Sequence, residues 1–138
     1  DASVRWLLEK GQNDLQIYQV EVGDARGDNK IQLSVGDGTD YARPITSVAV
    51  ANQWANIAMT FSGITAKIYL NGTLEDTQTM SNGVAQDLSN SEVLEIGRRS
   101  GGNYIEGKVA IINMYKNKAL TDQQVKENFN QQRSRFNI

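Results

Sequence analysis

The chain of 138 residues has the length of one domain. It contains no cysteine and no histidine, which excludes disulfides, thiol nucleophiles and the commonest ligands of transition metals. The formal net charge of −2 argues against nucleic acid as a partner, and no stretch of about 18 residues is apolar enough for a membrane span. These features predict a single domain, residues 1–138, that binds neither nucleic acid nor membrane.

Short segments in which apolar and polar residues alternate, separated by turn residues, fill most of the chain. Between the first two of them lies a polar, glycine-containing loop, residues 23–29. Later in the chain, Asn71-Gly72 predicts a β-hairpin, because a type I′ turn needs positive φ at both central residues. The expected strands are residues 15–22, 30–35, 45–50, 56–61, 67–70, 73–80, 92–96 and 108–115.

One helix is expected after these strands. Thr121 is a suitable N-cap, and Gln124, three residues later, completes a capping box. Asp122 falls in the first turn, where the helix dipole favours an anion. Val125 and Phe129 are four residues apart and share one face, which we expect to pack on a sheet. Many short strands and one terminal helix predict an all-β fold, a two-sheet antiparallel jelly-roll sandwich with one short C-terminal helix.

The carboxylates do not form an obvious catalytic pair. Hydrolysis of a glycosidic bond requires two carboxyl groups that flank the bond, and residues share a strand face only at even spacings. Glu92 and Glu95 are three apart, and Glu75 and Asp76 are adjacent, so the side chains of each pair should diverge. We therefore expect no catalytic residues and no enzyme activity.

Two loops carry the candidate metal ligands. Asp24 and Asp28 share the first loop, and Asp37 and Asp40 share the second, together with glycines. Oxygen ligands from such loops suit Ca²⁺, which is the one cofactor that the sequence suggests. The alternative is that these are ordinary turns, because aspartate and glycine are common turn residues. The integrin-binding tripeptide RGD at residues 26–28 is open to the same explanation.

Candidate ligand-binding residues are aromatic, amide and arginine side chains in loops and at strand ends. Arg98 and Arg99 lie in a glycine-rich stretch, residues 97–102, with Tyr104 close behind. This arrangement suits a sugar or a phosphate, although it also suits a solvated turn. The candidates are Tyr18, Tyr41, Arg98, Arg99, Asn103 and Tyr104.

The basic residues gather toward the C-terminus. Residues 98–138 hold eight of the fourteen lysines and arginines but only three acidic residues. This region is either a solvated basic face or a docking face for an acidic partner.

Several motifs in the second half of the chain together resemble the laminin-G-like, concanavalin A-like family. They are WANIAMT at 54–60, KIYLNG at 67–72, LEIG at 94–97, IEGKVA at 105–110 and INMYKNKALT at 112–121. The last motif resembles the closing strand of that family and the residues that precede its terminal helix. The resemblance covers residues 52–130 and implies a two-sheet jelly roll. It also implies that the opening strand of the family is missing here or comes from sequence outside these residues.

The resemblance implies binding, adhesion or scaffolding rather than catalysis. The tail VKENFNQQRSRF, residues 125–136, is similar to the ends of laminin-G-like domains in bacteriophage structural proteins. This similarity predicts a structural or adhesion module of a virion, in a capsid decoration, fibre or tail. Such a module would form a homo-oligomer or a multi-copy assembly with other virion proteins and contact host glycans. The alternative is a carbohydrate-binding, lectin-like module of an extracellular secreted or cell-surface protein.

Overall fold

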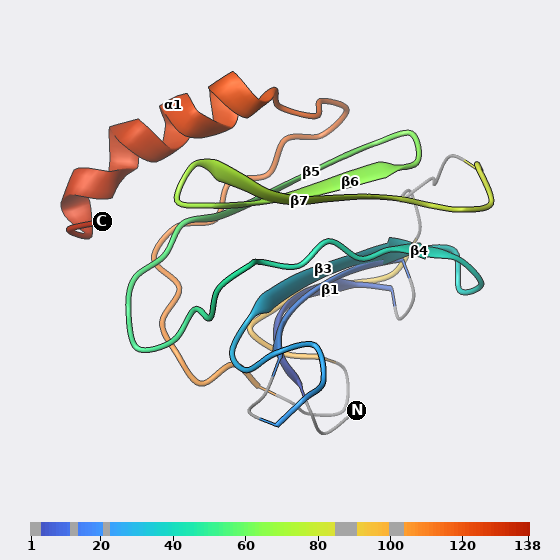
Figure 1. The fold of residues 1–138 in the computed structure, drawn as a ribbon, viewed down its shortest axis with the longest axis horizontal. Helices are drawn as coiled ribbons and strands as arrows, with labels where there is room; N and C mark the ends of the chain where they lie inside the picture. The colour runs from blue at the N-terminus through green and yellow to red at the C-terminus, as the bar shows by residue number, and fades with distance from the viewer. Residues whose placement is uncertain (1–3, 12–13, 21–22, 85–90, 100–103) are drawn as a thin grey trace.

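The computed structural model describes residues 4–11, 14–20, 23–84, 91–99 and 104–138, and shows two antiparallel sheets with one helix outside them (Figure 1). The strands are β1 (Val4–Lys10), β2 (Leu15–Val20), β3 (Ile31–Gly36), β4 (Tyr41–Ala42), β5 (Ile57–Ser62), β6 (Thr65–Leu70), β7 (Thr73–Thr79) and β8 (Leu94–Ile96). The helix α1 (Asp122–Gln132) is followed by one 3₁₀ turn, Arg133–Arg135. The predicted sandwich with a short C-terminal helix is confirmed.

The larger sheet has five strands in the order β4-β3-β2-β1-β8. Its neighbouring strands are antiparallel, and β1 contains a bulge between Trp6 and Leu8. The smaller sheet has the order β5-β6-β7. Its β6–β7 hairpin turns at Asn71 and Gly72, whose φ angles are +49° and +74°. The predicted Asn-Gly turn is therefore confirmed.

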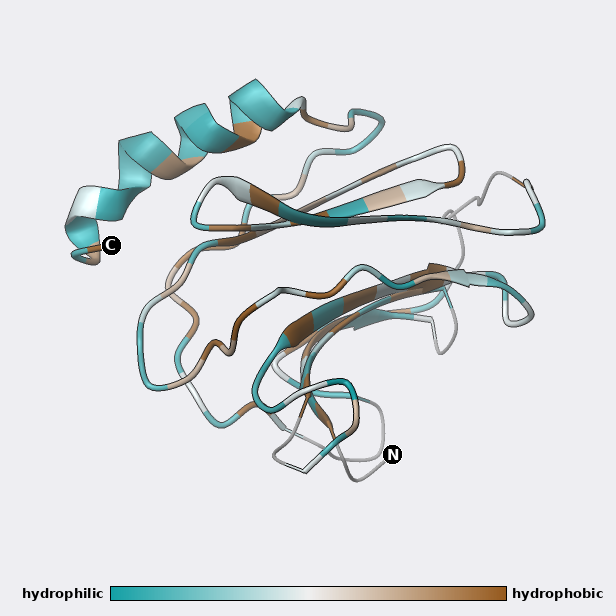
Figure 2. Cartoon of the chain, in the orientation of Figure 1, coloured by the Kyte–Doolittle hydropathy of each residue, from teal (hydrophilic) through white to brown (hydrophobic). Residues whose placement is uncertain are grey.

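The main core lies between the two sheets. Leu33 and Val35 from the five-stranded sheet pack with Ala66 of β6 and with Met80 just after β7. Hydrophobic segments, brown in Figure 2, occur in the strands of both layers. Burial of these side chains is the principal force that holds the layers together.

Helix α1 covers part of the outer surface of the three-stranded sheet (Figure 1). Thr121 accepts a hydrogen bond from the Gln124 amide, and the Gln124 side chain accepts one from the Thr121 amide, so the predicted capping box is confirmed. Val125 and Phe129 are buried on the face toward the sheet. Among the described residues, no helix has the length and apolar composition needed to span a membrane.

The prediction of a strand at residues 45–50 is wrong. Only a single bridge, between Gln32 and Ile45, joins this segment to a strand. The Thr46 amide donates to the Ile31 carbonyl of β3, and the Val50 amide donates to the Asn29 carbonyl. The amides of Ile45 and Ser47, on the other edge of the segment, donate to Asp76 and Glu75 of β7. The segment therefore pairs with β3 at one point only, and side chains of the opposite sheet bind its other edge.

The prediction of a strand at residues 108–115 is also wrong for the described chain. This segment runs alongside the sandwich to α1 without pairing, and every residue from 106 to 119 is exposed. Trp54, three residues before β5, is 40% exposed and contacts the ring of Phe136 at a centroid distance of 5.1 Å.

Candidate functional site

The side of the five-stranded sheet that faces away from the three-stranded sheet carries a second, mixed cluster, which we call the outer face. Strand alternation places Trp6, Tyr18 and Gln32 on this side, while their neighbours in sequence contribute to the main core. Trp6 and Tyr18 pack with ring centroids 5.0 Å apart. Polar and aromatic side chains are therefore held in fixed positions outside the core.

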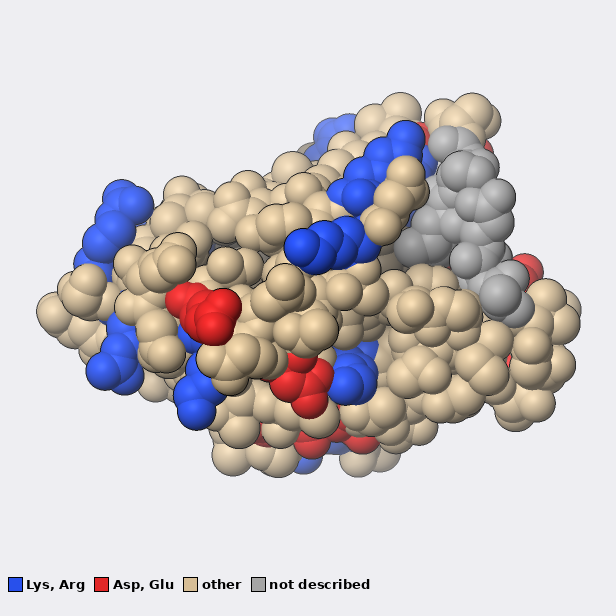
Figure 3. Space-filling view, turned by 90° about the horizontal axis from the view of Figure 1, so that it is seen from above, with Lys and Arg blue, Asp and Glu red and all other residues tan. Residues whose placement is uncertain are grey.

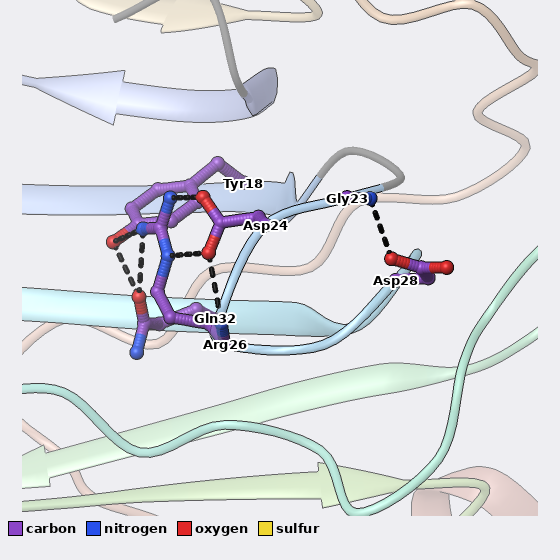
Figure 4. Close-up of polar contacts among 6 residues, drawn as sticks. All are labelled: Tyr18, Gly23, Asp24, Arg26, Asp28 and Gln32. Carbon is purple, nitrogen blue, oxygen red and sulfur yellow. Dashed lines mark hydrogen bonds and ion pairs between the residues drawn. The ribbon is translucent and has the colours of Figure 1, made fainter.

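The centre of the outer face is a hydrogen-bonded group around Tyr18 (Figure 4). The Tyr18 hydroxyl donates to Gln32 Oε1 over 2.6 Å. Arg26 lies over the Tyr18 ring, with its Cζ 5.5 Å from the centroid. Its Nη1 donates to the same Gln32 oxygen over 3.3 Å. Asp24 holds the guanidinium through Nε at 2.8 Å and Nη2 at 2.6 Å.

Burial raises the pKa of Tyr18, although the neighbouring guanidinium groups of Arg26 and Arg43 act in the opposite direction. The hydroxyl therefore stays protonated and remains a hydrogen-bond donor at neutral pH. The hydrogen bond to Asp24 raises the pKa of Arg26. This part of the face thus has a fixed charge and donor pattern over the physiological range.

The rim of the outer face is formed by Tyr41 and Arg43. A Cβ on Gly36 would lie 2.2 Å from Tyr41 Cδ1, so the tyrosine ring can occupy its position only because residue 36 is a glycine. The Arg43 guanidinium lies 3.9 Å above that ring, and its Nε donates to Ser34 Oγ over 3.3 Å. Arg43 is exposed, and no described carboxylate lies within ion-pair distance of it.

The four candidate calcium ligands have other partners. Asp24 binds Arg26, and Asp28 accepts a hydrogen bond from the Gly23 amide over 2.7 Å (Figure 4). Arg26 is turned toward Tyr18, so the two ends of the RGD tripeptide make separate local contacts. Within the described ranges, no group of three or more acidic side chains is arranged to hold a metal ion.

Asp37 and Asp40 join the β3–β4 loop to the turn after β7. Asp37 Oδ2 accepts from the Asn82 side chain over 3.1 Å, and Asp40 Oδ2 accepts from the Asn82 amide over 2.8 Å. Hydrogen bonds from Thr39 and Asp40 lower the pKa of Asp37 to about 2. The pair therefore links the two sheets at one end of the sandwich.

Sequence reasoning missed a pair of glutamates on the outer face. Glu9 of β1 and Glu95 of β8 are directly opposite each other in the antiparallel register. Residues in such positions have Cβ atoms roughly 4.5–5.5 Å apart. Arg99 Nε lies 3.2 Å from Glu9, and Arg98 Nη2 lies 2.7 Å from Glu95. A comparison of carboxylates that are close in sequence overlooks this pair, which the strand order brings together.

The other candidate ligand residues are dispersed. Arg98 forms an ion pair with Glu95 and Arg99 forms one with Glu9, and Arg99 also lies 4.6 Å above the Trp6 ring. Tyr104 is 64% exposed, and Asn103 lies outside the described residues. Arg98 also interacts with Tyr104, whereas Tyr18 and Tyr41 pack with Arg26 and Arg43. The candidates therefore do not all meet at one place among the described residues.

A shallow groove of about 450 Å³ lies between the exposed side of β5 and β6 and the start of α1. Hydroxyl groups of Thr60, Ser62 and Thr65 line it, but its charged side chains, Lys67 and Asp122, pair with each other at 2.8 Å. The surrounding surface carries separate basic and acidic patches, not one continuous basic field (Figure 3). The groove thus combines hydroxyl groups with apolar side chains, Ala119 and Leu120 among them, and its two charged side chains neutralise each other.

Residues 2–126 match a family model described as the concanavalin A-like lectin/glucanases superfamily. Among solved structures, the chain is similar to the crystal structure of an S-layer domain-containing protein, residues 221–444, from Clostridium thermocellum. The identity is 17% and the TM-score is 0.49, over 94% of this chain and 64% of that structure. No curated protein matches the sequence significantly. With nearly its whole length matched by the family model, the chain belongs to the concanavalin A-like lectin/glucanase superfamily.

Proposed function

We propose that this protein is a non-catalytic carbohydrate-binding module and that the outer face of the five-stranded sheet is its binding surface. One observation carries the proposal. Arg43 presents an exposed guanidinium on a tyrosine ring, with no carboxylate partner among the described residues. A guanidinium has five hydrogen-bond donors in a planar fork. Among the described residues, Arg43 uses its Nε toward Ser34 and leaves the outer donors to solvent.

The groups below Arg43 hold the surface in place. Gln32 is 6% exposed, accepts from the Tyr18 hydroxyl and donates to the Arg43 carbonyl over 3.2 Å. Ser34, 2% exposed, accepts from Arg43 itself. Side chains fixed in this way lose little rotational freedom when a ligand binds.

The charge of the surface indicates the kind of sugar. Asp24 neutralises Arg26, whereas the charge of Arg43 is uncompensated by any described carboxylate within ion-pair distance. An acidic sugar, with a carboxylate or sulfate group, would complete a charge-assisted pair with Arg43. Neutral glycans would gain only uncharged hydrogen bonds with Arg43. We therefore expect the ligand to be an acidic polysaccharide.

Binding to immobilised acidic and neutral polysaccharides tests this proposal. Arg43→Ala should weaken binding of the acidic polymer about ten-fold or more, since a hydrogen bond to a charged group contributes roughly 1.5–3 kcal/mol. Arg135→Ala is the matched control, because Arg135 is also exposed and lies over an aromatic ring, that of Phe136. Equal losses in both variants, or no binding by the parent chain, would contradict the proposal.

Glycoside hydrolysis is the second candidate function, and the Glu9–Glu95 pair favours it. Glycoside hydrolysis uses two carboxyl groups that flank the scissile bond, and Glu9 and Glu95 are directly opposite each other on neighbouring strands. Against this role, each carboxylate already binds its own arginine, and the Glu9 side chain is only 6% exposed. Release of reducing ends from a bound polysaccharide, abolished by Glu95→Gln, would establish hydrolysis and overturn the non-catalytic proposal.

An extracellular location, on a cell surface or a virion, accords with a lectin-like module. The virion location rests on the resemblance of residues 125–136 to phage proteins. Density-gradient sedimentation of native material, followed by mass spectrometry of its fractions, distinguishes the two. Peptides of this chain that travel with particles at a fixed ratio to a coat protein would support the virion, and peptides in the cell-envelope fraction would support the cell surface.

A further inference from the structure

Polar residues from all five strands of the larger sheet lie side by side across the outer face. Glu95 of β8 is opposite Glu9 of β1, and Glu9 is opposite Gln16 of β2. Gln16 is in turn opposite Ser34 of β3. Arg43 continues the same register directly after β4, and its Nε donates to Ser34 Oγ over 3.3 Å. We call this set, Glu95, Glu9, Gln16, Ser34 and Arg43, the polar row.

Side-chain contacts connect members of the polar row and extend it. Gln16 Nε2 donates to Glu9 Oε1 over 3.3 Å, and Arg99 Nε lies 3.2 Å from the same oxygen. Arg98 donates to Glu95 Oε1 from Nε over 3.0 Å and from Nη2 over 2.7 Å. Each glutamate is therefore neutralised by an arginine. The Arg98 side chain, which is 54% exposed, extends the polar row at the β8 edge of the sheet.

The polar row runs across the strands, whereas polar side chains soon end along them. On the same side of the sheet, Val20 lies two positions beyond Tyr18 on β2, and Val4 lies two positions before Trp6 on β1. Both valines are buried in an apolar cluster with Trp6 and Tyr18. A hydroxyl-rich ligand that followed a strand would meet this cluster. A ligand that follows the polar row has polar side chains from one edge of the sheet to the other.

Building on the proposed function, we propose that the acidic polysaccharide lies across the strands along the polar row, with an acidic group at Arg43 and sugar hydroxyls at Gln16 and Arg98. Arg43 and Arg98 are exposed and Gln16 is half-buried, so these three side chains are accessible to a ligand. Neighbouring strands are about 4.8 Å apart, so the four steps from β4 to β8 cover roughly 19 Å. A disaccharide is too short to span this distance, and the site therefore takes a longer oligosaccharide.

The two ends of the site differ in charge. Arg43 has no described carboxylate within ion-pair distance, so it favours an acidic group on the ligand. Arg98 is already paired with Glu95, so its remaining donors suit uncharged hydroxyl groups. The ligand consequently needs a charge at one end of the site and chain length toward the other.

Oligosaccharides of two lengths test the proposal. The probes are the di- and hexasaccharides of polygalacturonate and of chondroitin sulfate, titrated into the 138-residue chain and followed by NMR. We expect the hexasaccharide to bind more tightly than the disaccharide. Arg43→Ala should weaken both lengths about ten-fold or more, because it removes a charged partner. Arg98→Ala and Gln16→Ala should each weaken only the hexasaccharide, about two- to ten-fold, because they remove uncharged hydrogen bonds.

The amide resonances that shift on binding locate the ligand. The hexasaccharide should shift the amides of Gln16 and Glu95 as well as that of Arg43, and the disaccharide only amides near Arg43. If Arg43→Ala weakens binding but Arg98→Ala and Gln16→Ala do not, the ligand does not follow the polar row, and this inference fails while the proposed function stands. If no acidic oligosaccharide binds, or if Arg43→Ala leaves binding unchanged, the proposed function fails too. Arg135→Ala, beyond the end of α1, is the control and should change neither affinity.

Discussion

Replacement of Gly72 by alanine should destabilise the protein through two separable effects. Gly72 has a φ of +74°, and an L-residue in that region costs roughly 1–2 kcal/mol. A Cβ at this position would also lie 2.8 Å from Cδ1 and 3.0 Å from Cβ of Phe129 on α1. Overpacking of this kind costs about 1–3 kcal/mol. The two effects together predict a loss of about 2–5 kcal/mol in the free energy of unfolding.

Phe129→Ala separates the effects. In that background the contacts with the ring atoms are gone and only the 3.0 Å contact with Cβ of residue 129 remains. Gly72→Ala should therefore cost less than in the parent, approaching the backbone component of about 1–2 kcal/mol. Gly63→Ala is the matched control, because Gly63 has a φ of +60° and no heavy atom within 4 Å of the added Cβ. Urea unfolding of the single and double variants measures each cost. Equal losses for Gly72→Ala in both backgrounds would refute the steric argument.

Further predictions concern the helix cap, the hydrogen bonds of Asp37 and the outer face. Thr121→Ala should lower the free energy of unfolding by about 1 kcal/mol, whereas Thr121→Ser should preserve it, as thermal unfolding would show. Because hydrogen bonds lower the pKa of Asp37 from 3.8 to about 2, its stabilising contribution is complete above pH ~4 and is lost as the pH falls toward 2. Asp37→Asn should remove that part of the pH dependence in urea titrations between pH 2 and 5. Tyr18→Phe removes the donor to buried Gln32 and should cost about 1 kcal/mol in the same assay.

The helix and most strands could be predicted because their signals are local. Thr121 and Gln124 form the capping box within one turn. Asn71-Gly72 needs no distant residue to adopt its turn. Alternation in residues 15–20 and 31–35 predicts strands, since adjacent residues of a strand point to opposite faces. It did not predict that both faces of β3 are buried. These features follow from the immediate chain neighbourhood.

The outer face could not be predicted because its contacts cross strands. Glu9 and Glu95 are far apart in sequence and meet only because β8 pairs with β1. Arg43 lies just before residues 45–50, where the sequence pattern predicted a strand and gave no sign of a binding residue. Its position over Tyr41 depends on the space that Gly36 leaves. No spacing rule connects such residues until the strand order is known.

Alternation specifies the two faces of a strand but not its neighbours, and this explains the two wrong strands in different ways. At residues 45–50, Asp76 and Glu75 of β7 provide acceptors for backbone amides, so the segment is satisfied within the single chain. Residues 108–115 have no such acceptors among the described residues and keep their apolar side chains exposed. Alternation at residues 108–115 therefore predicted a strand for which no strand of the described chain provides the pairing.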